Sequence, residues 1–335
     1  MLSVAILGKQ NPLYFRKLMR SELEKNGLKA DILDMPTRDF GDFAEKLTSY
    51  DAVISCGEKI PAEAVKTLSE GKTKLISRWG VGTDEIDKQT AAKYGIAVCN
   101  AAGSLSVAVA ECALAMMIAL LREFPQRDAS VRKGDWSWFF DGRVSRQLEG
   151  KTVGLYGFGD IAKALAKMLY GFDCNVIATD LNWDEKIAEK YNVKRVDEET
   201  LIRGSDVLSL HVPALPSLVG MVNAEFLGKM KNSAILINTA RGKLVNEKDL
   251  ASALENGVIA AAGLDVFCPE PPASDNPLLK LKNVIVLPHS GAGTSECLEK
   301  SSQMAVGNIV EFFFGENGKT MKTILNPEYR TGRRG

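Results

Sequence analysis

Three polar residues suited to proton transfer and carboxylate binding follow three successive apolar runs of the sequence. Arg241 follows "AILINTA", Glu270 follows "AAGLDVF" and His289 follows "NVIVLP". Histidine exchanges protons near neutral pH, because its ordinary pKa is about 6.5. Arginine stays charged, and its planar guanidinium matches a carboxylate at two points. The pattern predicts an acid/base site in which a buried Glu270 orients His289 and Arg241 binds an anionic substrate.

Each of these residues also has a purely structural explanation. Arg241 could cap a helix, Glu270 could be a solvated loop residue in "CPEPP", and a histidine after a proline is more often structural than catalytic. The second histidine, His211, also ends an apolar run and competes for the role of base. The prolines that follow it favour a rigid wall, such as one beside an adenine. The joint appearance of three such residues at strand ends favours the site.

The elements that would position these residues are short strands alternating with helices, which is typical of parallel sheets built from βαβ units. Ligands of open parallel sheets lie beyond the carboxyl ends of the strands. Six nearly continuous apolar runs suit a sheet covered on both faces. We expect strands near residues 3–7, 30–35, 52–56, 74–77 and 96–100, and a second series near 152–157, 175–180, 207–212, 234–240, 261–266 and 283–288.

A glycine-rich turn links the first strand of the second series to a helix. Gly157, Gly159 and Ala162 form a GxGxxA pattern, in which the glycines permit a tight turn and close approach of a pyrophosphate to the helix N-terminus. Such turns also occur for packing alone. Asp180 ends the next strand, where an acid accepts hydrogen bonds from the adenosine ribose and repels a 2′-phosphate. No arginine occurs at 181–183, so we expect NAD rather than NADP.

The composition limits the class of partner. The chain has 335 residues with 42 basic and 42 acidic side chains, which leaves no basic excess for nucleic acid or an anionic membrane surface. The longest apolar run, 113–121, is shorter than the ~20 residues of a membrane span. Six scattered cysteines with no CxxC pair and no leader segment indicate reduced thiols in a cytoplasmic protein. We expect a small-molecule substrate and no metal site.

The length favours two domains. A helical pattern of apolar residues over 304–313 follows the last expected strand and has no strand after it. We therefore expect this helix to return to the first domain. The expected domains are a discontinuous substrate domain, 1–100 plus 295–335, and an NAD-binding domain, 101–294.

Seven segments in one order give the chain its resemblance to a known family. They are "RWGVGTDEID", "VAECALAMMIALLR", "LEGKTVGLYGFGDIAKALA", "HVPALP", "LINTARGKLVNEKDLASAL", "GLDVFCPEPP" and "LPHSGAGT". The chain resembles the D-isomer-specific 2-hydroxyacid dehydrogenases over nearly its whole length. The resemblance implies two Rossmann-like parallel-sheet α/β domains, a flavodoxin-like substrate domain and a doubly wound NAD-binding domain, and a homodimer. The loop after His211 lacks the Thr-Pro-Glu-Thr core that is usual in the family. This departure affects the expected contacts of the loop with the adenine and leaves the three catalytic positions unchanged.

The resemblance also implies roles for individual residues. Arg241 would bind the substrate carboxylate and carbonyl, Glu270 would support His289, and His289 would be the acid/base in reversible hydride transfer between NAD(H) and C2 of the substrate. Substrate contacts would come from Gly80, Val81, Gly82 and Arg241, and Arg78 beside them is a further candidate on its charge alone. Cofactor contacts would come from Gly157, Phe158, Gly159, Asp160, Ile161, Asp180, His211, Val212, Pro213, Thr239, Ala240, Arg241, Asp265, His289 and Gly291, with Asp265 at the nicotinamide carboxamide.

Two other functions fit the same fold. One is a scaffold that senses NAD(H) and binds protein partners, and the other is a formate dehydrogenase, whose reaction needs no proton transfer. Within the favoured function the sequence leaves the 2-hydroxy acid open between phosphoglycerate and glyoxylate or hydroxypyruvate types. Arg78 is a candidate cation for a phosphorylated acid.

Overall fold

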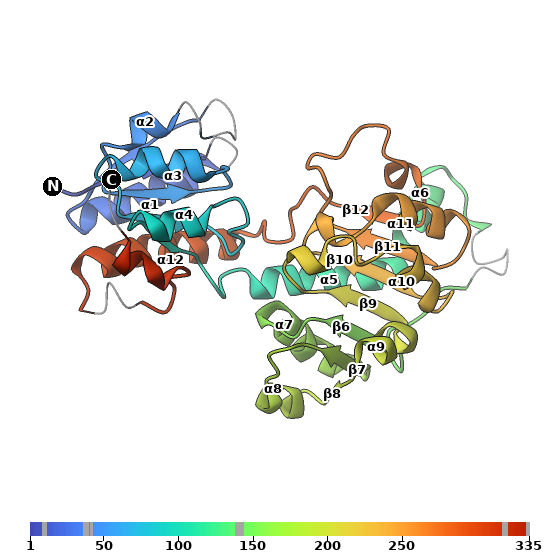
Figure 1. Cartoon of the computed structure of the whole chain (residues 1–335). Coiled ribbons are helices and arrows are strands. Elements are labelled where there is room, and N and C mark those ends of the chain that lie inside the picture. Colours follow the sequence, from blue (N-terminus) through green and yellow to red (C-terminus); the bar gives the residue numbers. More distant parts are fainter. Residues whose placement is uncertain (9–11, 36–39, 41–42, 138–143, 317–320, 333–335) are drawn as a thin grey trace. The chain divides into compact units, whose positions relative to one another are not determined.

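The computed structural model describes residues 1–8, 12–35, 40, 43–137, 144–316 and 321–332. The chain divides into two compact units. Unit 1 comprises Met1–Leu105 with Thr294–Gly335, and unit 2 comprises Ser106–Gly293. Each unit contains one parallel sheet flanked by helices (Figure 1). The prediction of two parallel-sheet α/β folds is therefore confirmed.

The five-stranded sheet of unit 1 has the strand order β2-β1-β3-β4-β5. This is the flavodoxin-like order, as predicted. Its strands are β1 (Ser3–Ile6), β2 (Lys29–Ile32), β3 (Ala52–Ser55), β4 (Leu75–Arg78) and β5 (Ala97–Cys99). Its helices are α1 (Leu13–Lys25), α2 (Ala44–Leu47), α3 (Ala62–Ser69), α4 (Lys88–Lys93) and α12 (Ser295–Phe314), with a 3-10 turn η8 (Pro327–Thr331).

Helix α12 completes the hydrophobic core of unit 1. Its buried residues Ala305 and Ile309 pack in one cluster with Val4 of β1 and Met19 of α1. In Figure 1 the red α12 lies against the blue α1, although the two helices are far apart in the sequence. The helical spacing of apolar residues in this segment thus produces a helix that belongs to the sheet formed by the start of the chain.

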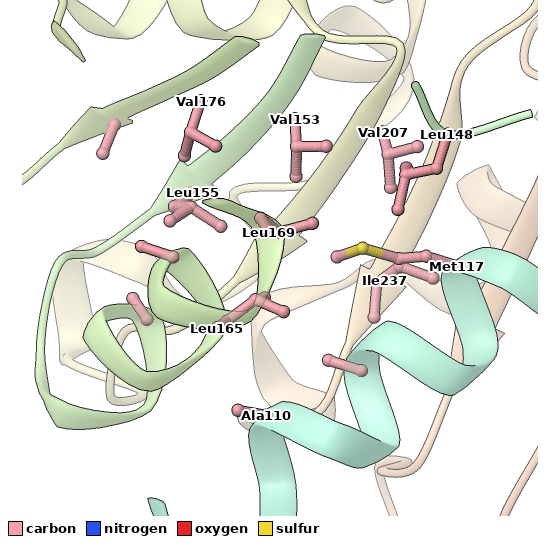
Figure 2. Close-up of a cluster of buried hydrophobic side chains, with 14 of the residues drawn as sticks. Ala110, Met117, Leu148, Val153, Leu155, Leu165, Leu169, Val176, Val207 and Ile237 are labelled. Atoms are coloured by element: carbon pink, nitrogen blue, oxygen red, sulfur yellow. The ribbon is translucent and has the colours of Figure 1, made fainter. Parts of the chain in front are cut away.

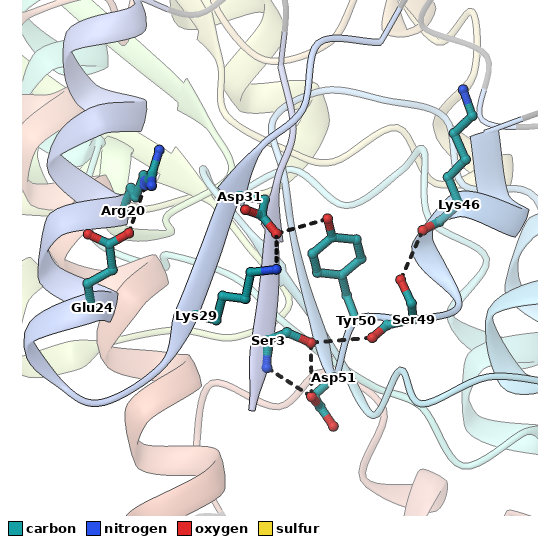
Figure 3. Close-up of polar contacts among 9 residues, drawn as sticks. All are labelled: Ser3, Arg20, Glu24, Lys29, Asp31, Lys46, Ser49, Tyr50 and Asp51. Carbon is teal, nitrogen blue, oxygen red and sulfur yellow. Dashed lines mark hydrogen bonds and ion pairs between the residues drawn. The ribbon is translucent and has the colours of Figure 1, made fainter. Parts of the chain in front are cut away.

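Polar contacts join the amino ends of β1 and β3 in unit 1 (Figure 3). The carboxylate of Asp51 accepts hydrogen bonds from the backbone N–H of Ser3 at 2.9 Å and from its hydroxyl at 3.1 Å. The Tyr50 hydroxyl donates to Asp31 at 3.1 Å, and burial raises the pKa of Tyr50. The Ser3–Asp51 contacts lie at the amino edge of the sheet, so we assign them to strand registration rather than to ligand binding.

The seven-stranded sheet of unit 2 has the order β12-β11-β10-β9-β6-β7-β8. The order reverses between β9 and β6, as in doubly wound nucleotide-binding folds. Its strands are β6 (Thr152–Tyr156), β7 (Asn175–Thr179), β8 (Val193–Arg195), β9 (Val207–Leu210), β10 (Ile235–Asn238), β11 (Ala261–Leu264) and β12 (Val284–Val286). Its helices are α5 (Ser106–Leu121), α6 (Phe124–Arg132), α7 (Asp160–Leu169), α8 (Glu185–Lys190), α9 (Glu198–Gly204), α10 (Ala224–Lys229) and α11 (Glu247–Glu255). Short 3-10 turns are η3 (Tyr170–Phe172), η4 (Pro216–Leu218), η5 (Gly242–Leu244) and η6 (Pro277–Lys280).

All six strands expected for this sheet are present, and the sheet also contains β8, which was not expected. Only Val193 of its three residues is buried, whereas Lys194 and Arg195 are exposed. The strand lacks an apolar run because it forms the edge of the sheet and pairs with β7 alone. Edge strands are commonly short and charged.

Helices α5 and α7 cover one face of the unit 2 sheet. Met117 of α5 and Leu165 of α7 pack with Leu155 of β6 and Ile237 of β10 in one buried cluster (Figure 2). Helix α5 is apolar on most of its surface because it contacts both α7 and strands β10 to β12. Each fully buried large aliphatic side chain in such a cluster contributes about 1.5–3 kcal/mol. This packing fixes the strand ends that carry the candidate site.

Candidate active site

The glycine-rich turn joins β6 to α7 and has the form of a dinucleotide cradle. Gly157 has φ +99°, and a side-chain carbon there would lie 2.7 Å from the carbonyl oxygen of His211. Gly159 caps α7, and a side-chain carbon there would meet no atom within 4 Å. Ala162 is fully buried in the first turn of the helix. The glycines thus leave open space at the N–H groups of a helix N-terminus, which suits a pyrophosphate.

Asp180 follows β7 and is held by two backbone groups. Its Oδ2 accepts the N–H of Phe158 at 2.6 Å, and its Oδ1 accepts the N–H of Asn182 at 2.7 Å. The carboxylate is therefore fixed next to the glycine-rich turn at the carboxyl edge of the sheet. The Phe158 ring stacks on Trp183 with a centroid distance of 4.7 Å.

His211 follows β9 beside the same turn. Burial lowers its pKa to about 4, so its imidazole is neutral near pH 7. Its Nε2 is buried and has no hydrogen-bond partner among the described residues. A neutral imidazole on a residue whose backbone lies against Gly157 supports a structural role beside the glycine-rich turn rather than the alternative role of base. Val212 and Pro213 follow it, with Pro213 exposed.

The turn after β10 is shaped by Asn238. Its side-chain oxygen accepts the N–H of Ala240 at 3.0 Å, and its side-chain nitrogen donates to the carbonyl of Arg241 at 2.9 Å. The Arg241 guanidinium donates to the Ala240 carbonyl at 2.7 Å. Thr239 has a buried hydroxyl without a hydrogen-bond partner in the part of the chain that the structure describes. Asn238 was not among the predicted site residues, although an asparagine ending a strand is a typical turn former.

Gly242 lets the turn after β10 approach the segment that carries Glu270. A side-chain carbon at Gly242 would lie 2.1 Å from both the carbonyl carbon and the oxygen of Phe267. The backbone N–H of Phe267 in turn donates to Glu270 Oε1 at 3.1 Å. The absence of a side chain at position 242 therefore brings the Arg241 turn next to the Glu270 loop.

Glu270 and His289 form a direct pair. Glu270 Oε2 lies 2.7 Å from His289 Nδ1, and the side chains are 29% and 53% exposed, respectively. The expectation of a buried Glu270 carboxylate is therefore wrong, although its pairing with His289 is as predicted. An ionised carboxylate only accepts hydrogen bonds, so Nδ1 is the donor and Nε2 remains for proton exchange.

Asp265 binds the backbone of the His289 loop at three consecutive positions. Its carbonyl accepts the N–H of His289 at 2.8 Å, and its carboxylate oxygens accept those of Ser290 at 2.7 Å and Gly291 at 2.8 Å. His289 has a left-handed φ of +53°, which non-glycine residues seldom adopt. Burial raises the pKa of Asp265 against the opposing effect of these hydrogen bonds. Asp265 thus holds the backbone that presents the His289 ring.

The substrate residues expected in unit 1 lie at the end of β4 and in the loop that follows it. Arg78 donates from Nε to the Gly82 carbonyl at 3.0 Å and from Nη1 to the Ser55 carbonyl at 3.4 Å. The Asn100 side chain donates to the Val81 carbonyl at 2.9 Å, and the Gly80 carbonyl accepts the N–H of Ala101. Gly80 has φ +133°. Arg78 and Asn100 therefore shape the 80–82 loop.

The geometry agrees with a family model of known proteins. The model for the NAD binding domain of D-isomer specific 2-hydroxyacid dehydrogenases matches residues 114–291. The chain belongs to this family. The matched residues make up nearly all of unit 2, which thus corresponds to the NAD-binding domain of this family.

Relatives within the family differ in substrate. A glyoxylate reductase of Thermococcus litoralis is 38% identical over 282 residues, which cover 82% of this chain and 84% of the relative. A D-3-phosphoglycerate dehydrogenase of Archaeoglobus fulgidus is 37% identical over 289 residues, which cover 86% of this chain but 53% of the relative. The chain spans about half the length of such phosphoglycerate dehydrogenases.

The fold is also that of solved dehydrogenases. The NAD-dependent formate dehydrogenase from Staphylococcus aureus in complex with NAD superposes with a TM-score of 0.81 at 26% identity, covering 96% of this chain and 98% of that one. Among the described residues, no helix is both long and apolar enough to cross a membrane.

Proposed function

We propose that this protein is an NAD-dependent D-2-hydroxyacid dehydrogenase that reversibly interconverts a small 2-hydroxy acid and the corresponding 2-oxo acid. The observation that carries the proposal is the Glu270–His289 pair at 2.7 Å, located on the same unit as the glycine-rich turn and Asp180. An acid/base pair beside a nucleotide cradle is what oxidation of an alcohol requires.

His289 is the proposed acid/base. In the reduction its Nε2 donates a proton to the substrate oxygen, and in the oxidation the neutral ring accepts that proton. Glu270 holds the ring through Nδ1 and is itself held by the Phe267 N–H. NAD, when bound, accepts or supplies the hydride at C2 of the substrate. General acid/base catalysis of this kind contributes about 10²–10⁴ in rate.

Arg241 is the proposed ligand of the substrate carboxylate and the group that polarises its carbonyl. Its turn is fixed by Asn238 and by the contact of Gly242 with Phe267. Preorganised cations are effective because they need no reorientation as negative charge develops on the oxygen. We propose backbone groups of Gly80, Val81 and Gly82 as further carboxylate contacts.

Cofactor contacts are proposed for the residues that line the carboxyl edge of the unit 2 sheet. Gly157 to Ile161 would contact the pyrophosphate, Asp180 the adenosine ribose, and His211 to Pro213 the adenine side. The hydroxyl of Thr239, which has no hydrogen-bond partner among the described residues, suits the nicotinamide side together with Ala240. Gly291 is proposed on the same side, and its lack of a side chain lets the backbone approach Asp265, because a side-chain carbon there would lie 2.8 Å from Asp265 Oδ2. The proposed carboxamide contact of Asp265 would use lone pairs not taken by Ser290 and Gly291.

The Glu270–His289 pair favours a 2-hydroxy acid over the two alternatives. Oxidation of formate to carbon dioxide moves a hydride and no proton, so it has no use for the pair. A scaffold that only senses NAD(H) needs neither His289 nor Arg241. Among 2-hydroxy acids we keep the phosphoglycerate and the glyoxylate or hydroxypyruvate types as candidates, with Arg78 as the proposed cation for a phosphorylated acid.

A homodimer and a cytoplasmic location belong to the same proposal. Exposed apolar side chains cluster in the sequence on α5, α6 and the residues just after them, namely Val107, Phe124, Val131 and Trp136. Apolar surface of this kind is typical of a protein interface. All six cysteines are free, which fits a reducing compartment.

The test is a screen of NADH oxidation with glyoxylate, hydroxypyruvate, pyruvate and phosphohydroxypyruvate, together with NAD reduction by formate. We expect turnover of at least one 2-oxo acid and a loss of about 10²–10⁴ in kcat for His289→Ala. NADH binding by this variant, followed by fluorescence, should be nearly unchanged. Tight NADH binding with no turnover of any acid would exclude the enzyme, and turnover of formate alone would select the formate branch.

A further inference from the structure

An arginine from the edge strand lies beside Asp180. Arg195 ends β8 and donates from Nη2 to the backbone carbonyl of Asp180 at 3.1 Å. Its guanidinium carbon lies 5.3 Å from the centroid of the Trp183 ring. The Trp183 ring also stacks on the Phe158 ring, with the two centroids 4.7 Å apart. Trp183 therefore contacts both the buried Phe158 ring and the Arg195 guanidinium. Arg195 lies fifteen positions after Asp180 in the sequence. The residues at 181–183, which contain no arginine, therefore give no sign of it.

The place of Arg195 in the sheet puts it at the ligand edge. Strands β7 and β8 are parallel, with Ala178 opposite Arg195, so Arg195 and Asp180 both lie at the carboxyl ends of their strands. Ligands of an open parallel sheet bind beyond these ends. An acid in the position of Asp180 binds the ribose 2′-hydroxyl of NAD, and a nearby arginine accommodates the 2′-phosphate of NADP.

The segment between the two strands is held firmly. Lys163 of α7 pairs with Asp184, the N-cap of α8, at 2.7 Å. Both carboxylate oxygens of Asp180 are bonded to backbone N–H groups. These contacts fix the Asp180 carboxylate, and the Arg195 guanidinium bonds the backbone carbonyl of the same residue. A positive charge therefore lies at the residue whose carboxylate would repel a 2′-phosphate.

The guanidinium of Arg195 has donors left for an anion. One of its five N–H groups serves the Asp180 carbonyl, and arginine matches phosphate oxygens with two parallel N–H groups. The residue is exposed, so these donors remain accessible. Stacking on Trp183 reduces the side-chain freedom that phosphate binding would otherwise remove.

We infer that Arg195 forms a binding subsite for a phosphate on the adenosine ribose, so that the protein uses NADPH as well as NADH. Arg195 is a specificity-determining residue of the cofactor site and takes no part in the hydride or proton transfer. The inference rests on the proposed function only in assigning the nucleotide to the turn at Gly157.

Calorimetric titration of the full chain with 2′,5′-ADP and with 5′-AMP tests this subsite without substrate or turnover. We expect the wild-type protein to bind 2′,5′-ADP at least as tightly as 5′-AMP. Arg195→Gln should raise the Kd of 2′,5′-ADP by about tenfold or more, because it removes a charge-assisted pair of hydrogen bonds. The Kd of 5′-AMP should change by less than about twofold. Arg195→Lys, which keeps the charge without the planar fork, should fall between the two.

The matched control is Arg203→Gln. Arg203 is also an exposed arginine of unit 2 and pairs with Glu199, but it lies near the end of α9 that leads into the amino end of β9. The Arg203→Gln variant should bind 2′,5′-ADP and 5′-AMP with the same affinities as the wild type. The ratio of kcat/KM for NADPH to that for NADH should fall in Arg195→Gln alone.

Equal weakening of 2′,5′-ADP and 5′-AMP in Arg195→Gln would overturn the inference, because it would mean that Arg195 only supports Trp183. Failure of the wild-type protein to bind 2′,5′-ADP where it binds 5′-AMP would also overturn it. Either result leaves the proposed dehydrogenase function standing. A different outcome is that no 2-oxo acid is turned over while binding of 2′,5′-ADP depends on Arg195. That result would exclude the proposed function and support the subsite.

Discussion

Glu270 and His289 lie 2.7 Å apart through Oε2 and Nδ1, and this contact fixes which nitrogen of the ring can serve a substrate. Nδ1 is committed to the carboxylate, so Nε2 is the proton-exchanging atom. The residues reach each other because β11 and β12 are adjacent parallel strands, with Leu264 opposite Val286, and each leads into one of the two loops.

Replacement of Glu270 by glutamine tests the importance of this pair. The amide keeps the shape of the side chain but removes the charge that orients and stabilises the protonated ring. We expect kcat to fall by about tenfold or more, with little change in the KM for NADH. Glu225→Gln, which removes an exposed carboxylate paired with Lys229 on α10, should keep full activity. Equal steady-state kinetics of Glu270→Gln and wild type would contradict the role.

Asp265→Ala tests the support of the His289 backbone. The change leaves the N–H groups of Ser290 and Gly291 without their acceptor, at a cost of about 1–3 kcal/mol for each unsatisfied donor. Relief of a buried charge offsets part of this cost, since burial raises the pKa of Asp265. We therefore expect a modest loss in the free energy of unfolding and a large loss in kcat.

The control for Asp265 is Asp249→Ala, because Asp249 also accepts a backbone N–H, that of Ala224, away from the site. Urea unfolding and steady-state kinetics should separate the two variants, with kcat reduced only for Asp265→Ala. A variant of Asp265 that loses stability but keeps kcat would show that the His289 loop needs no such support.

The strands that the sequence revealed consist of apolar runs, and the one that it concealed does not. Strands β6, β9 and β10 are almost entirely buried, so they appear as continuous apolar runs. β8 has one buried residue of three, and pairing with β7 rather than hydrophobicity makes it a strand. Arg195 was missed for the same reason, since only the pairing of β7 with β8 brings it to Asp180.

The sequence predicts those features of the candidate site that depend only on residue type and on position at the end of a strand. Glu270 and His289 could be paired because both follow neighbouring strands of one sheet. The three hydrogen bonds from the 289–291 backbone to Asp265 were not predictable, because they depend on the left-handed φ of His289. Histidine is enriched in that region of φ, but only a small minority of histidines adopt it. The exposure of Glu270 also depends on the path of the 267–271 loop, which local sequence does not define.

Gly159→Ala separates folding from cofactor binding. Gly159 has φ −78° and ψ −169°, which alanine adopts without strain, and the new methyl group would meet no protein atom within 4 Å. We expect the free energy of unfolding to change by less than about 0.5 kcal/mol. The Kd of NADH should rise by about tenfold or more, because the methyl group occupies the space that a pyrophosphate needs.

Gly228→Ala is the matched control for Gly159, because its added methyl group also meets no atom within 4 Å but lies on α10. Alanine at this helical position should stabilise the protein by up to about 1 kcal/mol and leave NADH binding unchanged. Fluorescence titration with NADH gives the comparison, and unaltered binding by Gly159→Ala would remove the turn from the cofactor site.

His211 gives unit 2 a pH-dependent stability whose sign follows from its burial. The pKa is lowered to about 4 in the folded protein, whereas an unfolded histidine titrates near 6.5. Between these values the unfolded chain binds more protons, so the free energy of unfolding falls as the pH falls from about 6.5 towards 4. The loss from this residue between pH 7 and about pH 4.5 amounts to roughly 2–3 kcal/mol.

His211→Gln removes the titrating ring and should therefore reduce the loss of stability over this pH interval by about that amount. Other groups that titrate in the interval contribute equally to both proteins, so the difference between the two pH profiles isolates His211. Urea denaturation of the cofactor-free protein at several pH values provides the measurement. Parallel profiles would mean that His211 is accessible to protons in the folded state. That result would favour the role of base for His211 over a structural role as a neutral ring.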